Sequence, residues 1–125
     1  MEAVIHTTFK DLAPMITRKR LVLEGLMKRQ FTNPEINKYM IQLSSVMNMT
    51  IVTNPVFSYD KDYGTSAYMC WKESGMHVYT WKKNDDRPDF ISIDIYTCKD
   101  FNIEDVLECT VTTFKDLFLE LTWRE

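Results

Sequence analysis

Four consecutive segments of the chain have the residue pattern of β-strands, with no helical segment between them. They are rich in β-branched and aromatic residues and span Thr50–Tyr59, Thr65–Glu73, Met76–Lys82 and Asp89–Cys98. The connections between them are short and polar, as in Asp60–Gly64. A parallel pair of strands needs a crossover of about a dozen residues or more, so short connections imply antiparallel pairing. These segments therefore predict a largely antiparallel sheet.

Two helices and two further strands complete the predicted fold. Asn33 is expected to cap a first helix, with Pro34 at its first position, and Asn102 is expected to cap a second. Strands are predicted at Arg20–Met27 and Leu117–Trp123. The resulting order is β-α-β-β-β-β-α-β. This order predicts an α+β fold, a two-layer sandwich with both helices on one face of the sheet.

A single domain is expected from the length of the chain. The 125 residues, of which 45% are hydrophobic, match one ordinary domain with one core. No repeat, low-complexity segment or flexible linker divides the sequence. We predict that residues 18–125 form this domain. Residues 1–17, which Pro14 interrupts, are predicted to be an irregular N-terminal segment.

The composition argues against several classes of protein. A formal net charge of −3 is unlike that of a nucleic-acid-binding protein. The three cysteines show neither a disulfide framework nor the spacing of a metal site. Met1–Leu12 lacks the apolar core of a signal peptide, and no apolar run approaches the roughly 20 residues of a membrane span. We therefore expect a soluble, cytoplasmic protein with no nucleic-acid or membrane partner.

Alternation along two strands predicts a face of the sheet that the helices leave open. In Phe90–Cys98 the isoleucines point to one side, while Asp94 and Tyr96 point to the other. In Met76–Lys82 the second side carries His77, Tyr79 and Trp81. Exposed aromatic patches of this kind mark interfaces or ligand sites. We expect this open face to pack on a second copy in a homodimer; the alternative is that the N-terminal segment covers it.

The residues Glu73-Ser74-Gly75 form a predicted corner between two strands. A serine hydroxyl at such a corner can attack the carbonyl of the preceding residue, and Cys98, at the end of a neighbouring strand, can donate a proton. Gly75 is expected to ease a strained turn, because it has no Cβ. Together these residues suggest a chain that cuts itself and builds its own cofactor.

In this order, the segments resemble the S-adenosylmethionine decarboxylase family in its short prokaryotic or viral form. The resemblance rests on the bond Glu73-Ser74, on Ser66 eight residues before that serine, on Thr80-Trp81, on the strand motif Ile93–Cys98 and on Leu23-Glu24-Gly25. It covers most of the chain, from about Arg18 onward. The family fold is an antiparallel sheet with helices on one face, and the open faces pack together in a dimer.

The resemblance implies a chemistry for several residues. The Glu73–Ser74 bond would be cleaved autocatalytically, and Ser74 would become a pyruvoyl group, the cofactor that accepts electrons during decarboxylation. Ser66 would donate a hydrogen bond to the oxyanion formed during cleavage, and Cys98 would protonate the product. The substrate would be S-adenosylmethionine or a similar small molecule, in polyamine synthesis. The predicted substrate-binding residues are Leu23, Glu24, Trp81 and Asp94.

Two positions depart from the family pattern. The family's processing base is a histidine five residues after the cleaved serine, where this chain has Tyr79, and His77 is the candidate replacement. The acid that holds the ribose hydroxyls follows the tryptophan in the family, where this chain has Lys82-Lys83. Two alternatives therefore stand beside the decarboxylase. One is a non-processing homologue that binds a nucleoside-like ligand or regulates a partner, and the other acts on S-adenosylmethionine without a pyruvoyl group.

Overall fold

The computed structural model describes residues 2–125, and its elements follow the predicted order. The elements are β1 (Lys19–Met27), α1 (Asn33–Val46), β2 (Val56–Asp60), β3 (Gly64–Trp71), β4 (Ser74–Trp81), β5 (Asp89–Thr97), α2 (Ile103–Phe114), the short 3-10 helix η1 (Lys115–Leu117) and β6 (Phe118–Arg124). None of the helices in residues 2–125 is both long and apolar enough to cross a membrane.

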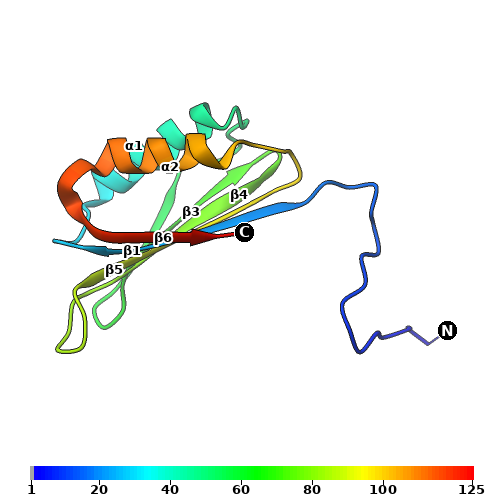
Figure 1. Cartoon of the computed structure of the whole chain (residues 1–125), viewed down its shortest axis with the longest axis horizontal. Helices are drawn as coiled ribbons and strands as arrows, with labels where there is room; N and C mark the ends of the chain where they lie inside the picture. Colours follow the sequence, from blue (N-terminus) through cyan, green and yellow to red (C-terminus); the bar gives the residue numbers. More distant parts are fainter. Residues whose placement is uncertain (1) are drawn as a thin grey trace.

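The strands form one sheet in the order β2-β3-β4-β5-β1-β6, and each neighbouring pair is antiparallel. Both helices lie side by side on the same face of this sheet, which leaves the opposite face open (Figure 1). The predicted α+β class is therefore confirmed. The first strand, β1, lies between β5 and β6, so the two ends of the domain meet within the sheet.

The core lies between the sheet and the helices. Ile91, Ile93 and Ile95 are fully buried there, as the alternation along β5 predicts. Polar groups within this layer are paired. The Trp71 indole donates a 2.7 Å hydrogen bond to Ser44 Oγ, which in turn donates to the carbonyl of Met40 at 2.7 Å. Such pairing avoids the free-energy cost of a buried polar group without a partner.

Several predicted boundaries differ from the structure by a few residues, and two of these differences have a clear physical reason. The cap of α1 is Thr32 rather than Asn33, and it forms a capping box with Glu35: the Glu35 N–H donates to Thr32 Oγ1 at 3.3 Å, and the Thr32 N–H donates to Glu35 Oε1 at 2.8 Å. The strand predicted from Thr50 begins only at Val56, because Pro55 has no N–H to give to a sheet. The cap at Asn102 is confirmed: its side chain accepts a 2.8 Å hydrogen bond from Glu104 N.

The N-terminal segment contains no helix or strand in residues 2–17 and extends away from the sheet (Figure 1). In this structure it therefore does not cover the open face of its own chain. Six of its large apolar side chains are exposed.

We predict that Glu35 makes stability depend on pH. The Arg29 guanidinium, 2.9 Å away, lowers the Glu35 pKa from 4.5 to about 2. Stabilisation by the ionised form is therefore complete above about pH 5 and is lost as the pH falls from 4.5 through 2. Glu35→Gln should lower the free energy of unfolding by about 1 kcal/mol at pH 7 and by almost nothing near pH 2, measured by urea denaturation.

The matched control is Glu108→Gln on the exposed side of α2, where no ion pair involving Glu108 is found in residues 2–125. It should leave stability unchanged at both pH values. Equal losses for Glu35→Gln at pH 7 and pH 2 would contradict the assigned ion pair.

Candidate functional site

The open face of the sheet carries a hollow of about 530 Å³ that spans four strands. Its lining residues come from β1, β3, β4 and β5 and are Arg20, Tyr68, Ser74, Gly75, His77, Tyr79, Asp94 and Tyr96. Four of them were predicted from the sequence as site residues, namely Ser74, His77, Tyr79 and Asp94. The lining combines aromatic rings with charged groups, which is the composition of a small-molecule site.

Gly75 leaves room for this hollow. It lies between Cys70 and Tyr96 in the register of β3, β4 and β5, and it places no side chain in that row. A Cβ at Gly75 would come within 2.6 Å of the Met69 carbonyl oxygen. Any larger residue would therefore push β4 away from β3 as well as fill the row.

The backbone strain at the corner is on Ser74 rather than on Gly75. The hairpin turns at Lys72 and Glu73, and Ser74 begins β4 with φ at 142°, a value that residues with a Cβ rarely adopt. The expectation that Gly75 relieves the turn was therefore wrong in its location, since Gly75 has no positive φ. A strained residue of this kind stores about 1–3 kcal/mol, and such residues cluster at functional sites.

The carbonyl of Glu73 is held by the end of β5. The Cys98 N–H donates a 2.9 Å hydrogen bond to Glu73 O, and Thr97 pairs with Ser74 in the antiparallel register. The Cys98 side chain is exposed beside this contact. The structure thus brings together three predicted residues: Glu73, Ser74 and Cys98.

The carboxylate of Glu73 fixes the same hairpin from the other side. It accepts hydrogen bonds from Thr50 N at 2.9 Å and from Thr50 Oγ1 at 3.1 Å. The backbone bond from Thr50 is the largest cause of a lowered pKa for Glu73. Lys72 N donates to Thr50 O at 2.8 Å, so the hairpin tip is joined to the segment after α1 by three hydrogen bonds.

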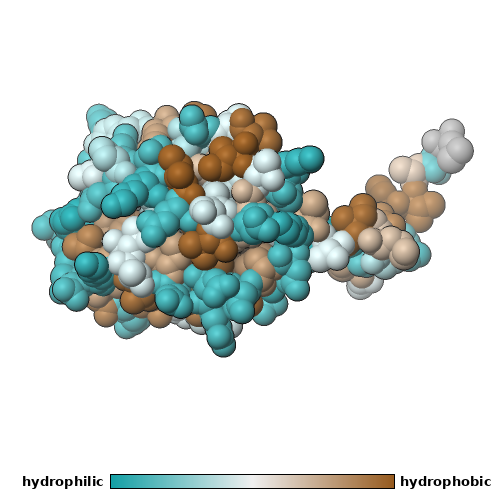
Figure 2. All heavy atoms as spheres, turned by 90° about the horizontal axis from the view of Figure 1, so that it is seen from above, coloured by the Kyte–Doolittle hydropathy of each residue, from teal (hydrophilic) through white to brown (hydrophobic). Residues whose placement is uncertain are grey.

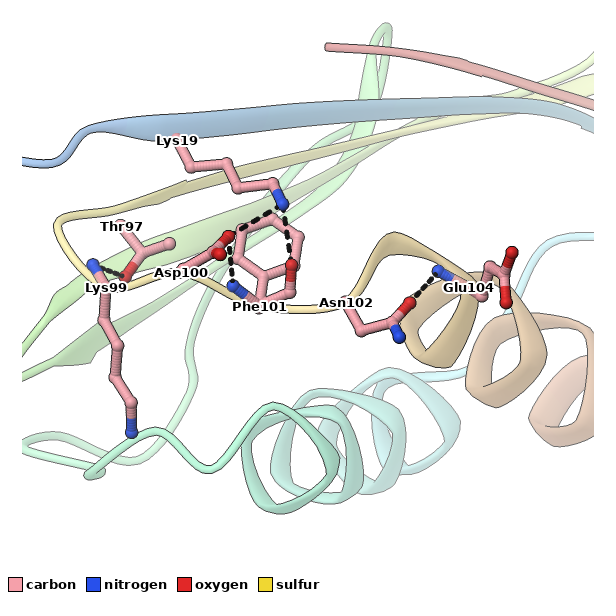
Figure 3. A network of polar contacts seen from close by, with 7 residues as sticks. All are labelled: Lys19, Thr97, Lys99, Asp100, Phe101, Asn102 and Glu104. Atoms are coloured by element: carbon pink, nitrogen blue, oxygen red, sulfur yellow. Dashed lines mark hydrogen bonds and ion pairs between the residues drawn. The ribbon is translucent and has the colours of Figure 1, made fainter.

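The segment that follows Cys98 is held by polar contacts on both sides (Figure 3). Lys99 N donates to Thr97 Oγ1 at 3.0 Å. Lys19 Nζ, at the start of β1, donates to Asp100 Oδ1 at 2.9 Å and to Phe101 O at 2.7 Å, and this lysine lowers the pKa of Asp100. Cys98 therefore lies on a connection whose position is fixed by its neighbours.

An ion pair and a row of rings form the rest of the hollow. Arg20 donates two hydrogen bonds to Asp94, from Nε at 3.0 Å and from a terminal nitrogen at 2.6 Å. The His77 ring lies 4.5 Å from the Tyr68 ring and is stacked on Tyr79 with centroids 5.4 Å apart. Flat rings and a paired charge at one place suit a ligand with an aromatic base and polar groups.

Ser66 and Tyr79 lie apart from Ser74. Ser66 is directly opposite Tyr79 in the β3–β4 pair, five positions along β4 from Ser74. At about 3.3 Å per residue this separation is about 17 Å. His77 is three positions away on the same strand, or about 10 Å. Within one chain, the strand therefore separates the backbones of these residues from the Glu73–Ser74 bond, although His77 and Tyr79 line the same hollow as Ser74.

The predicted substrate-binding residues are spread over both faces. Leu23 is fully buried under the helices, so it has no surface for a ligand on the open face. Glu24, its neighbour, is on the open face, where Ser92 Oγ donates to it at 3.2 Å. Trp81 lies further along β4, with its ring 5.3 Å from that of Phe90. Of these predicted substrate-binding residues, only Asp94 lines the hollow.

Sequence reasoning missed Arg20, Tyr68 and Tyr96. Tyr96 was assigned to the open face but not to a site, and Arg20 was predicted only as the first residue of a strand. Alternation along β1 could have placed Arg20 on the open face. The pairing of β1 with β5, which brings Arg20 opposite Tyr96 and beside Asp94, has no local signal in the sequence.

Comparison with known protein families identifies the family of this chain. The family model of S-adenosylmethionine decarboxylase matches residues 26–121, which is most of the chain. The chain therefore belongs to the S-adenosylmethionine decarboxylase family. No curated protein matches it. In residues 2–125, no cluster of three or more His, Cys, Asp or Glu side chains is arranged to hold a metal ion.

We predict that glycine at position 74 stabilises the fold. Ser74→Gly removes the Cβ that makes φ at 142° unfavourable, whereas Ser74→Ala keeps it. Neither variant has a hydroxyl that can attack Glu73, so both stay intact. Ser74→Gly should exceed Ser74→Ala in free energy of unfolding by about 1 kcal/mol in urea titrations. Equal stability, or a less stable glycine variant, would show that Ser74 is not strained.

Proposed function

We propose that this chain is a self-processing, pyruvoyl-dependent decarboxylase of S-adenosylmethionine or a closely similar compound, and that it serves polyamine synthesis. The main support for the proposal is the environment of the peptide bond between Glu73 and Ser74. Its carbonyl, on Glu73, accepts the Cys98 N–H at 2.9 Å, and its other side is Ser74 with φ at 142°. Polarisation of a carbonyl and strain on the adjoining residue both favour attack by a hydroxyl.

The first step is an internal acyl shift. Ser74 Oγ bonds to the Glu73 carbonyl carbon, the carbon–nitrogen bond breaks, and the hydroxyl proton ends on the Ser74 nitrogen, which leaves an ester. The oxygen that gains charge on the way is the one that accepts from Cys98 N–H. The Cys98 amide thus supplies, within the chain, a donor that the sequence assigned to Ser66 alone. Removal of the Ser74 α-proton then eliminates the ester, which releases the carboxylate of Glu73 and leaves an enamine at residue 74. Water hydrolyses the imine form of this enamine to the pyruvoyl ketone and releases ammonia.

The α-proton needs a base that a single copy does not place nearby. Tyr79, His77 and Ser66 lie about 10–17 Å from Ser74 along the sheet. A second copy packed through the open face can supply them. A two-fold axis near His77 would put the Ser66–Tyr79 row of one copy over the Ser74 end of the other. We therefore propose that the working site lies between two copies.

In the processed protein, a pyruvoyl group at position 74 supplies a carbonyl that takes up electrons when the substrate loses carbon dioxide. The exposed Cys98 thiol is positioned to protonate the carbon left behind. The rings of Tyr68, His77 and Tyr79 hold the base of the ligand by stacking. Asp94, oriented by Arg20, accepts hydrogen bonds from its polar groups.

A second candidate function is an intact protein that binds a nucleoside-like ligand, or acts on S-adenosylmethionine, without cleavage. Two observations favour it. A phenol, which is a weaker catalytic base than an imidazole at neutral pH, occupies the place of the processing base at Tyr79. Lys82 and Lys83 occupy the place of the ribose-binding acid, and the Lys82 ammonium contacts the Tyr59 hydroxyl. Neither change removes the hollow itself.

We predict that purified protein incubated at pH 7 divides into fragments of residues 1–73 and 74–125, the second blocked at its N-terminus by pyruvate. Denaturing mass spectrometry measures both masses. The control, Ser74→Ala, should keep the full-length mass under the same conditions. A wild-type chain that also keeps it after prolonged incubation would exclude the pyruvoyl function. Turnover or binding of S-adenosylmethionine by that intact chain would then establish the second candidate.

We also predict that Tyr79→His accelerates cleavage. An imidazole with a pKa near 6.5 is a far better base at neutral pH than a phenol, so the rate should rise by about tenfold or more and should increase between pH 6 and pH 7.5. Tyr79→Phe, which keeps the ring but has no basic group, is the control and should give no acceleration. Equal rates for the histidine and phenylalanine variants would show that position 79 is not where the base acts.

A further inference from the structure

The N-terminal arm, residues 2–17, is unusually apolar for a segment in water. Its exposed large apolar side chains are Val4, Ile5, Phe9, Leu12, Met15 and Ile16. Phe9 is 90% exposed and Met15 is 95% exposed. Figure 2 shows several hydrophobic residues on this arm, well away from the body of the domain. A contiguous apolar surface of this kind marks a contact with another molecule.

The base of the arm has a fixed shape. Arg18 pairs with the Asp11 carboxylate and donates to Ala13 O at 3.2 Å. Ala13 N donates to Asp11 Oδ1 at 2.9 Å, and Ile16 N donates to Ala13 O at 2.9 Å. These contacts form a compact turn between Asp11 and Arg18. They direct residues 2–10 outward, away from the sheet of their own chain (Figure 1).

The arm leaves the domain beside the candidate site. Lys19, the first residue of β1, pairs with Thr97, and Thr97 pairs with Ser74. Two strand spacings of about 4.8 Å put the start of β1 roughly 10 Å from Ser74. Arg20, one residue further, lines the hollow. An arm that starts here can cross the edge of the hollow and contact a molecule that packs on the open face.

The chain offers one surface that matches the arm. At the end of the open face, beyond the hollow, Trp81 and Phe90 are half-buried with their rings 5.3 Å apart, and neither residue lines the hollow. On the same face, Arg20 and Asp94 offset each other's charge by pairing. The arm and this end of the face both leave apolar surface at least partly exposed in their own chain.

The apolar area of the two arms is also compatible with the area of a stable protein interface. Burial of one large apolar side chain removes on the order of 100 Å² from water, so two arms with six such side chains each would bury roughly 1,200 Å². An equal area on the receiving faces brings the contact to at least the size of a stable protein interface, about 1,200–2,000 Å².

We propose that the arm of each copy docks on the second copy at the end of its open face that carries Trp81 and Phe90, beyond the hollow, so that two copies packed face to face also hold each other by exchanged arms. This inference rests on the face-to-face pair of the proposed function but not on cleavage at Ser74. The N-terminal arm then contributes to the contact between the two copies and forms part of the wall around the site. The partner is a second copy of this chain.

The test compares two arm variants of the full chain by sedimentation equilibrium. The triple variant Ile5→Ser, Phe9→Ser, Leu12→Ser should raise the dissociation constant of the dimer by about 100-fold or more, since three large apolar contacts are lost. The matched triple variant Thr7→Ala, Thr8→Ala, Lys10→Ala should leave the dissociation constant within about threefold of wild type. Circular dichroism should show the same fold for both, because all six substituted side chains are exposed.

A second measurement identifies the surface that the arm touches. A photoreactive benzoylphenylalanine replaces Phe9, and isotopically heavy and light chains are mixed before irradiation. We expect crosslinks between heavy and light chains that map to β3, β4 or β5. Crosslinks within one chain only, or an equal dissociation constant for both triple variants, would overturn the arm exchange. A wild-type monomer would overturn it together with the two-copy site.

The outcomes separate this inference from the proposed function. A wild-type dimer weakened by the apolar triple variant supports the arm exchange whether or not Glu73–Ser74 is cleaved. A chain that cleaves normally and dimerises equally well in both triple variants retains the proposed function and rejects the arm exchange.

Discussion

The hydrogen bond from the Cys98 amide to the Glu73 carbonyl is the contact on which the rest of the site depends. It joins the end of β5 to the turn between β3 and β4, so one interaction sets the positions of the predicted nucleophile and proton donor. The Glu73 carboxylate on Thr50 and the Lys19 contacts with Asp100 and Phe101 hold the two sides of this joint. Secondary structure alone would leave both connections free to move relative to each other.

The two faces of the sheet have different roles. The helix side buries a close-packed layer in which Ile91 to Ile95 alternate with the residues of the open side. The open side carries aromatic rings, the Arg20–Asp94 ion pair and the hollow. Ser74 and Tyr79, which are five positions apart along β4, both line this hollow. A strand holds such groups at fixed spacings, which keeps the backbones of Ser66 and Tyr79 about 17 Å from Ser74 within one copy.

The sequence predicted the parts of this structure that depend on local pattern. Alternation in Phe90–Cys98 identified the buried isoleucines, and short polar connections identified the antiparallel strands. The cap of α1 was misplaced by one residue because Asn33 is as good a cap by type as Thr32, and only the reciprocal bonds with Glu35 decide between them. Leu23, predicted to bind substrate, is buried, and Arg20 lines the hollow instead. Alternation along β1 already separates the faces of these two residues, but the neighbours that Arg20 meets, Asp94 and Tyr96, depend on the pairing of β1 with β5, which has no local signal.

The position of β1 between β5 and β6 has a consequence for a chain nicked at residue 73. The strands before the nick and those after it alternate across the sheet, as β2-β3, then β4-β5, then β1, then β6. Separation of the two pieces would break the β3–β4, β5–β1 and β1–β6 ladders at once. The nicked molecule would therefore persist as one interlaced body. Once denatured, however, its pieces would have to find each other by diffusion, so renaturation would become dependent on protein concentration.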